Sequence, residues 1–174
     1  MNKNPHLAYT SIVPEIKGNS SIRRVIILLH GYGSNMKDLA SLSEYIEDDG
    51  NLYVSINAPI KLVDFGTQSF AWFEIGAIED MEQRKYSVQK STDLILNTIN
   101  HIINVFNTDS TPIVLAGFSQ GGMMAMNIAL TSDQNFDGVA ALSSRLITNP
   151  SNKMNNLNFF ISHGTKDNVI DISE

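Results

Sequence analysis

The chain has 174 residues, 43% of them hydrophobic, and carries a formal net charge of -6. This acidic balance argues against a nucleic acid or an anionic membrane surface as partner. The absence of cysteine excludes a disulfide framework and a thiolate metal site, and it fits a reducing compartment. The first ten residues contain no apolar signal core, and no stretch approaches transmembrane length. We therefore predict one soluble domain over residues 1–174, located in the cytoplasm, with no stable membrane insertion.

The first half of the chain alternates apolar runs with glycine-containing loops. Residues 7–16 alternate weakly, as in an edge strand, and residues 25–29 form a continuous apolar run typical of a central strand. The loop 30–35 follows, and then a helix is predicted over 36–48. A further strand is predicted over 52–56. Three predicted strands, with a helix between the last two, indicate the start of an α/β domain.

The stretch from Ile60 to Glu82 has no clean period and contains several aromatic residues. A loop of this length in a compact domain is usually functional. The alternative is that its aromatic side chains simply seal the edge of the sheet.

The second half continues the alternation. The spacing of apolar residues predicts a helix over 87–106, and strands are predicted over 113–116, 138–142 and 157–162. A helix is expected to begin near Gln120. Repeated alternation predicts a mostly parallel central sheet with helices on both faces, whose ligands bind at the carboxyl ends of the strands.

The segment Gly117-Phe118-Ser119-Gln120-Gly121 has the G-x-S-x-G pattern between the strand 113–116 and an apolar helix. A serine hydroxyl can attack a carbonyl only if it stands clear of its own backbone beside a base. A sharp strand-to-helix turn achieves this, and glycine at 117 and 121 relieves the crowding that the turn creates. The pattern therefore favours Ser119 as a nucleophile. The alternative is a tight turn whose serine only caps the helix.

Five segments of the chain stand out together. They are Leu29-His30-Gly31-Tyr32-Gly33, Ala71-Trp72-Phe73-Glu74, Ala116 to Gly122, Ala141-Leu142-Ser143, and His163-Gly164 with Asp167. With these segments the chain resembles the phospholipase/carboxylesterase family of α/β-hydrolases, which includes the acyl-protein thioesterases, in the family's order over nearly the whole chain. One departure is Ser144, where the family usually has glycine, so the loop there is expected to differ.

The resemblance implies a role for each matching residue. Ser119 would be the nucleophile, and the backbone N–H groups of Tyr32 and Gln120 would form the oxyanion hole. Asp167 would orient the catalytic histidine, although Lys166-Asp167-Asn168 is also typical of a turn.

A binding role is implied for the aromatic loop. Trp72 and Phe73 are expected to bind substrate by walling an apolar groove for an acyl chain beside Ser119.

The catalytic histidine is the member of the family's triad for which this sequence has no matching residue. The fold orders its triad as serine, acid and histidine, yet no histidine follows Asp167 in the chain. His6 is expected to be exposed, His30 to fix the oxyanion loop, and His101 to lie on a polar helix face. His163 is the only conceivable substitute. We therefore expect the domain to be incomplete at its C-terminus, with the last strand and helix of the fold missing.

Two functions follow as expectations. One is a serine carboxylesterase or thioesterase that hydrolyses small acyl esters or thioesters through an acyl-serine intermediate, without metal or cofactor. A dienelactone-hydrolase-like or peptidase-like enzyme of the same fold is an alternative within this class. The other is a catalytically inactive, truncated remnant that binds acyl ligands or a partner. Association into a homo-oligomer through the strand 157–162 is left open.

Overall fold

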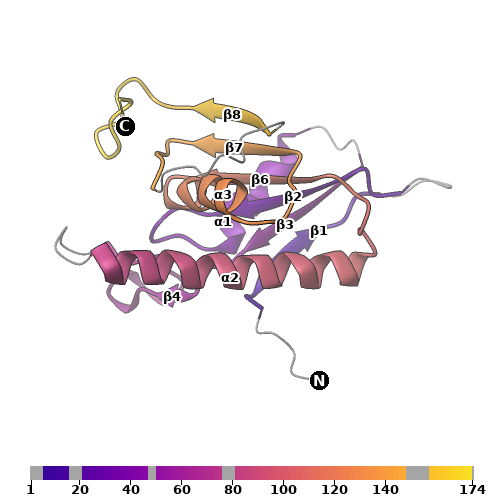
Figure 1. Cartoon of the computed structure of the whole chain (residues 1–174), viewed down its shortest axis with the longest axis horizontal. Coiled ribbons are helices and arrows are strands. Elements are labelled where there is room, and N and C mark those ends of the chain that lie inside the picture. Colours follow the sequence, from indigo (N-terminus) through magenta and orange to yellow (C-terminus); the bar gives the residue numbers. More distant parts are fainter. Residues whose placement is uncertain (1–5, 16–20, 47–49, 76–80, 148–156, 174) are drawn as a thin grey trace.

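We describe a computed structural model of the chain, covering residues 6–15, 21–46, 50–75, 81–147 and 157–173. A six-stranded sheet in the order β1-β3-β2-β6-β7-β8 forms its centre (Figure 1). Apart from β1, which runs antiparallel to β3, neighbouring strands are parallel. This arrangement confirms the predicted α/β-hydrolase type of sheet.

The three central strands are the apolar runs of the sequence. They are β3 (Asn51–Ile56), β2 (Arg24–Leu29) and β6 (Ile113–Phe118). Every residue of β3 is buried, and β2 is buried over its last three residues. Strands covered on both faces need apolar side chains in both directions, which explains why these segments show no alternation.

The outer strands are less buried. β1 (Tyr9–Ile12) is the antiparallel edge strand that the weak alternation predicted, although it is shorter than the range 7–16, of which residue 16 lies outside the described residues. β7 (Gly138–Leu142) has the predicted bounds, and β8 (Asn158–Ser162) forms the opposite edge. Phe160 and Ile161 of β8 are each 63% exposed.

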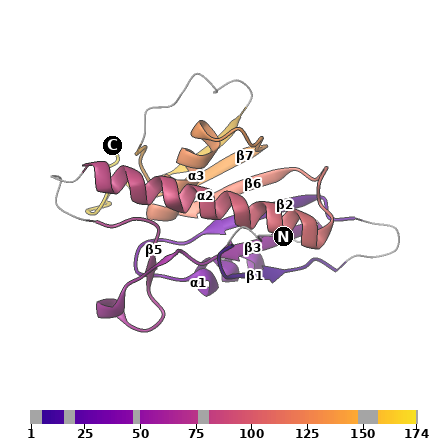
Figure 2. The same cartoon turned by 60° about the horizontal axis from the view of Figure 1, so that its bottom comes forward.

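Two helices pack side by side against the sheet (Figure 2). α2 (Met81–Phe106) begins six residues before the predicted range of 87–106, and α3 (Gln120–Thr131) begins at the predicted residue. α3 contacts β6 and β7 and is buried from Gln120 to Leu130. This burial on all sides explains why its sequence is almost entirely apolar.

The first helix is shorter than the sequence predicted. α1 (Met36–Ala40) ends within the predicted range 36–48 and continues as a 3-10 turn, η1 (Ser41–Glu44); residues 47–49 lie outside the described part. Asn35 caps α1 by accepting from the Lys37 N–H, as its type suggested. The hydroxyls of Ser41 and Ser43 donate to the carbonyls of residues three positions earlier. Serine hydroxyls that bind nearby carbonyls compete with the α-helical ladder, which explains its early end.

The irregular stretch after β3 contains a small second sheet. β4 (Ile60–Lys61) pairs antiparallel with β5 (Phe70–Ala71), and a 3-10 turn, η2 (Val63–Phe65), lies between them. A further bridge joins Phe70 of β5 to Ser34, in the loop after β2. This stretch, predicted only as a loop, is therefore hydrogen-bonded to the loop in which we expected one oxyanion donor.

The register of the parallel strands brings their carboxyl ends to one edge. Leu29 pairs with Gly117, Phe118 with Leu142, and Leu142 with Ser162. The residues that follow β2, β6, β7 and β8 therefore meet at this edge, as expected for a sheet that binds ligands there. These residues are His30, Ser119, Ser143 and His163.

Candidate active site

Ser119 occupies a strained turn between β6 and α3. Its backbone has φ 52° and ψ -120°, a conformation that residues with a side chain rarely adopt. Hydrogen bonds hold the residue on both sides, because its N–H donates to Leu142 O at 2.8 Å and its carbonyl accepts from Met123 N at 3.0 Å. Its hydroxyl makes no capping hydrogen bond to the described helix. The backbone has the geometry of a strand-to-helix elbow. The alternative, a serine that only caps the helix, is not supported, because the hydroxyl makes no capping hydrogen bond.

The two glycines of the motif are required by packing. A Cβ added at Gly121 would lie 2.0 Å from Leu29 O, and one at Gly117 would lie 2.4 Å from the Gly121 backbone. Neither contact is compatible with a side chain. The elbow can therefore press against the end of β2 only because both positions lack a Cβ.

The two residues expected to supply oxyanion donors follow neighbouring strands. Gln120 is the first residue of α3, and Tyr32 lies in the turn after β2. Since β2 and β6 pair directly, with Leu29 opposite Gly117, both residues belong to the same edge of the sheet. The start of α3 also adds the positive end of the helix dipole there.

His30 is a fixed, neutral part of the loop that contains Tyr32. It is fully buried, and its Nε2 accepts a hydrogen bond from the Ala58 N–H at 3.1 Å. Its Nδ1 must therefore carry the proton that is donated to Gly31 O at 2.8 Å. Burial lowers the pKa of His30, against the opposing effects of the Gly31 carbonyl and the Asp38 charge. The ring holds the loop in place, as the sequence suggested, and has no spare nitrogen for catalysis.

Trp72 and Phe73 lie in the hydrophobic core. Their exposed fractions are 0% and 2%, so neither ring faces an open groove in this structure. The sequence left open that the aromatic residues simply seal the edge of the sheet; these two rings belong to the buried core, and their role in substrate binding stays a prediction. Trp72 also makes a polar contact with the loop after β2, because its indole Nε1 donates to His30 O at 2.8 Å. The Arg84 guanidinium lies over the Phe73 ring, 5.7 Å from its centroid.

Asp167 lies just past β8, beside the segment that follows β7. One carboxylate oxygen accepts the N–H groups of Val169 at 2.9 Å and Ile170 at 3.1 Å, and the Ser143 hydroxyl donates to the same side chain. These two backbone donors, followed by nearby His163 and Ser143, lower the pKa of Asp167. Asp167 thus forms the turn that the sequence offered as one alternative, and its role as the acid of a triad stays a prediction.

The histidines do not complete a triad with Ser119. His163 Nε2 lies 3.6 Å from the second Asp167 oxygen but only 2.8 Å from Ile170 O. The rings of His6 and His101 stack on each other, with centroids 4.1 Å apart. Within the described residues, none of the four rings is hydrogen-bonded to the Ser119 hydroxyl.

Three polar side chains of the site escaped the sequence analysis. Ser144 attracted notice only as a departure from the family pattern, yet its hydroxyl donates to the Ser119 carbonyl at 2.8 Å. Ser143, with φ 46°, contacts Asp167. The side chain of Gln120 joins Trp72 and Phe73 to the elbow. Ser143 and Gln120 lie within the quoted motifs, but the motif predicts a backbone role for Gln120 rather than one for its amide, and it predicts no role for Ser143.

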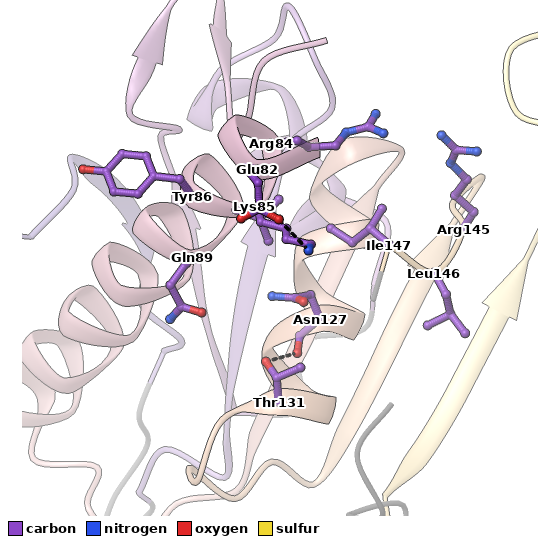
Figure 3. A pocket seen from close by; sticks show the side chains of 11 residues that line it. Glu82, Arg84, Lys85, Tyr86, Gln89, Asn127, Thr131, Arg145, Leu146 and Ile147 are labelled. Atoms are coloured by element: carbon purple, nitrogen blue, oxygen red, sulfur yellow. Dashed lines mark hydrogen bonds and ion pairs between the residues drawn. The ribbon is translucent and has the colours of Figure 1, made fainter. Parts of the chain in front are cut away.

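A pocket of about 720 Å³ lies between α2, α3 and the segment after β7 (Figure 3). Its cations include Lys85, which is paired with Glu82 at 2.9 Å, while Arg84 packs on Phe73. Its deeper amide, Asn127 Nδ2, donates to Thr92 at 3.0 Å. Much of the polar lining of this pocket thus already interacts with other residues of the protein.

No group of three histidine, aspartate or glutamate side chains among the described residues is arranged to hold a metal ion. None of the helices in that part of the chain has both the length and the apolar character needed to cross a membrane.

Comparison with known proteins agrees with this architecture. The chain is 32% identical over 171 residues to acyl-protein thioesterase 1 of Candida albicans, covering 87% of this chain and 73% of that protein. It is 29% identical over 168 residues to acyl-protein thioesterase 1 of Mycosarcoma maydis, covering 83% and 69%.

Solved structures show the same fold at lower identity. The crystal structure of esterase PE8 matches with a TM-score of 0.79 at 20% identity, covering 97% of this chain and 79% of that one. Acyl-protein thioesterase 2 of Zea mays matches with a TM-score of 0.71 at 18% identity, covering 97% and 80%. The sequence profile of phospholipases and carboxylesterases matches residues 11–174. The chain therefore belongs to the phospholipase/carboxylesterase family of α/β-hydrolases.

Proposed function

We propose that this protein hydrolyses small acyl esters or thioesters through a covalent acyl-Ser119 intermediate. The observation that carries the proposal is the elbow, because it holds Ser119 at φ 52° while leaving its hydroxyl out of the helix cap. Such strain is maintained only where the surroundings impose it, and it is typical of functional residues. The relatives named as acyl-protein thioesterases support the choice of an acyl substrate.

The chemistry proceeds in two steps. Ser119 Oγ attacks the carbonyl carbon of the substrate while a base takes its proton, and the carbonyl oxygen becomes an oxyanion. The Tyr32 and Gln120 N–H groups stabilise that charge. The tetrahedral intermediate then expels the alcohol or thiol, which takes the proton back from the base. Water repeats the sequence on acyl-Ser119 and releases the carboxylic acid.

Asp167 is the proposed acid of the triad. Its first oxygen is occupied by two backbone N–H groups, which fixes the orientation of the carboxylate. The lowered pKa keeps it ionised at neutral pH, as needed to stabilise an imidazolium. The nearest ring, that of His163, is bound to Ile170 O through Nε2, so we do not assign it as the base.

Without an assigned base, we propose that residues 1–174 alone turn over slowly. A serine hydroxyl stays protonated and is a weak nucleophile when no base accepts its proton. The oxyanion hole and substrate binding would still give about 10³–10⁴-fold over water. The second candidate function, an inactive module that binds acyl ligands or a partner, is favoured by this same observation.

A fluorophosphonate probe and a p-nitrophenyl ester separate the two candidates. When a histidine completes the triad, we expect covalent labelling at Ser119, and Ser119→Ala should abolish it while leaving the unfolding midpoint unchanged. In the presence of the complete triad, Ser119→Ala should lower kcat by about 10⁴-fold or more. His163→Gln should leave turnover unchanged. Absence of labelling in the unsubstituted protein would favour the binding module, and loss of turnover in His163→Gln would make His163 the base.

A further inference from the structure

The side chain of Gln120 forms a two-sided bridge inside the protein. Its Oε1 accepts from the Trp72 backbone N–H at 2.8 Å, and its Nε2 donates to Phe73 O at 2.7 Å. The side chain is only 2% exposed. A buried amide with both ends engaged is held in one orientation, because losing either bond leaves a polar group unsatisfied. The first turn of α3 is therefore fixed to the segment that follows β5.

Phe70 of β5 and Trp72, in turn, hold the loop after β2, residues 30–34, at three points. Gly33 N donates to Phe70 O at 2.9 Å, and Phe70 N donates to Ser34 O at 2.9 Å. The Trp72 indole donates to His30 O at 2.8 Å. These contacts lie on both sides of Tyr32 in the sequence, so the position of the Tyr32 N–H depends on residues 70–72.

The two proposed donors are thus connected through one chain of buried hydrogen bonds. It runs from Gln120 to Trp72 and from there to His30, two residues before Tyr32. The Ser91 hydroxyl also donates to Trp72 O, which adds a contact from α2.

We infer that the amide side chain of Gln120 is a positioning residue, which sets the separation between the two oxyanion donors. Its own N–H is one donor, and its side chain fixes the loop that carries the other. The catalytic part of this inference rests on the proposed function. It goes beyond that function in giving the side chain, rather than only the backbone, a part in the reaction.

The expected effect follows from the geometry that an oxyanion hole demands. Loss of one donor typically costs about 10²–10³-fold in kcat, and a displacement of 1 Å costs about 10²-fold. We therefore expect Gln120→Leu to lower kcat by about 10²-fold with little change in KM. The matched control is Gln89→Leu, since Gln89 is an exposed glutamine of α2 whose side-chain amide donates to Asp93 at 2.9 Å.

Two milder variants keep the test valid if Gln120→Leu does not fold. Trp72→Phe removes the indole N–H that donates to His30 O, together with part of the buried ring, and it keeps the backbone hydrogen bond to Gln120. Gln120→Glu retains the acceptor for Trp72 N but lacks the donor for Phe73 O until its carboxyl is protonated. The ratio of its kcat to that of the unsubstituted protein should therefore rise as the pH falls. If the side chain of Gln120 acted only by filling space, the ratio of the two kcat values would not depend on pH in this way.

Hydrogen exchange tests the positioning independently of catalysis. The Gly33 amide is bonded to Phe70 O, so its exchange should be slow, and Gln120→Leu and Trp72→Phe should accelerate it by at least about 10-fold. Unchanged exchange at Gly33 in both variants would overturn the inference. Faster exchange without any loss of kcat would also overturn it, because the donors would then not depend on the bridge.

The same data separate the inference from the proposed function. If the unsubstituted protein shows neither turnover nor labelling of Ser119, the proposed function fails. The exchange at Gly33 then still decides whether Gln120 positions the loop. With turnover present, an unchanged kcat in Gln120→Leu removes only the role of its side chain.

Discussion

The Ser144 hydroxyl donates a hydrogen bond of 2.8 Å to the carbonyl oxygen of Ser119. It also lies 3.0 Å from Leu142 O, so the one proton is shared between the two strand ends. Ser144 is 9% exposed, and a Cβ added at Gly122 would lie 2.1 Å from its Oγ. The serine that departs from the family pattern therefore fits against a glycine of the elbow and supports the strained residue directly.

Ser144→Ala should weaken the elbow. The Ser119 carbonyl keeps its bond from Met123 N, so the loss is that of one hydrogen bond, about 0.5–1.5 kcal/mol in the free energy of unfolding. We expect urea unfolding to show this loss and kcat to fall while KM stays the same. Ser110→Ala, at an exposed serine, is the control. A kcat equal to that of the control would limit Ser144 to a structural role.

Gly121→Ala should destabilise the protein severely. The added methyl would lie 2.0 Å from Leu29 O, and the backbone of β2 cannot yield without disturbing the sheet. We expect a loss of about 3 kcal/mol or more, measured by thermal or urea unfolding. In Gly164→Ala the methyl meets nothing closer than 4.0 Å, so a change within about 0.5 kcal/mol is expected. Similar stabilities for the two variants would contradict the close packing of the elbow.

His30 should make stability depend on pH. Because burial lowers its pKa, the unfolded chain binds a proton more readily than the folded one. The contribution of this group is present above its usual pKa of about 6.5 and is lost as the pH falls toward the folded value. Urea midpoints measured between pH 7.5 and pH 5, roughly the range in which histidine titrates, should therefore decline.

A substitution isolates this effect. His30→Gln should be less stable than the unsubstituted protein at pH 7 but should show a shallower decline on acidification, since the titrating ring is gone. Equal slopes for both proteins would assign the pH dependence to other groups.

Trp72→Ala should act first on stability. Removing a fully buried indole typically costs about 3–5 kcal/mol, which urea unfolding would reveal. Because the ring lies in the core, we expect the variant to affect turnover of acetyl and longer acyl esters alike. A selective rise in KM for the longer chains would instead support the groove wall that the sequence suggested for Trp72.

The sequence by itself determined the strands and the elbow. Apolar runs such as residues 25–29 are continuous because central parallel strands are covered on both faces, and this information is local. The glycines flanking Ser119 likewise reveal a crowded turn without reference to any distant residue. Local spacing therefore sufficed for the sheet type, for α3 and for the position of the proposed nucleophile.

Only the tertiary structure decided how the rest of the site is held together. Trp72 and Gln120 are separated by 48 positions, yet a hydrogen bond joins them, and no periodicity records such a pair. The direction of a side chain from an irregular loop depends on the backbone path, so the sequence could not place Trp72 and Phe73 in the core. Ser144 gained its role because pairing of β6 with β7 brings it beside Ser119, a contact between strand ends that is set by sheet register.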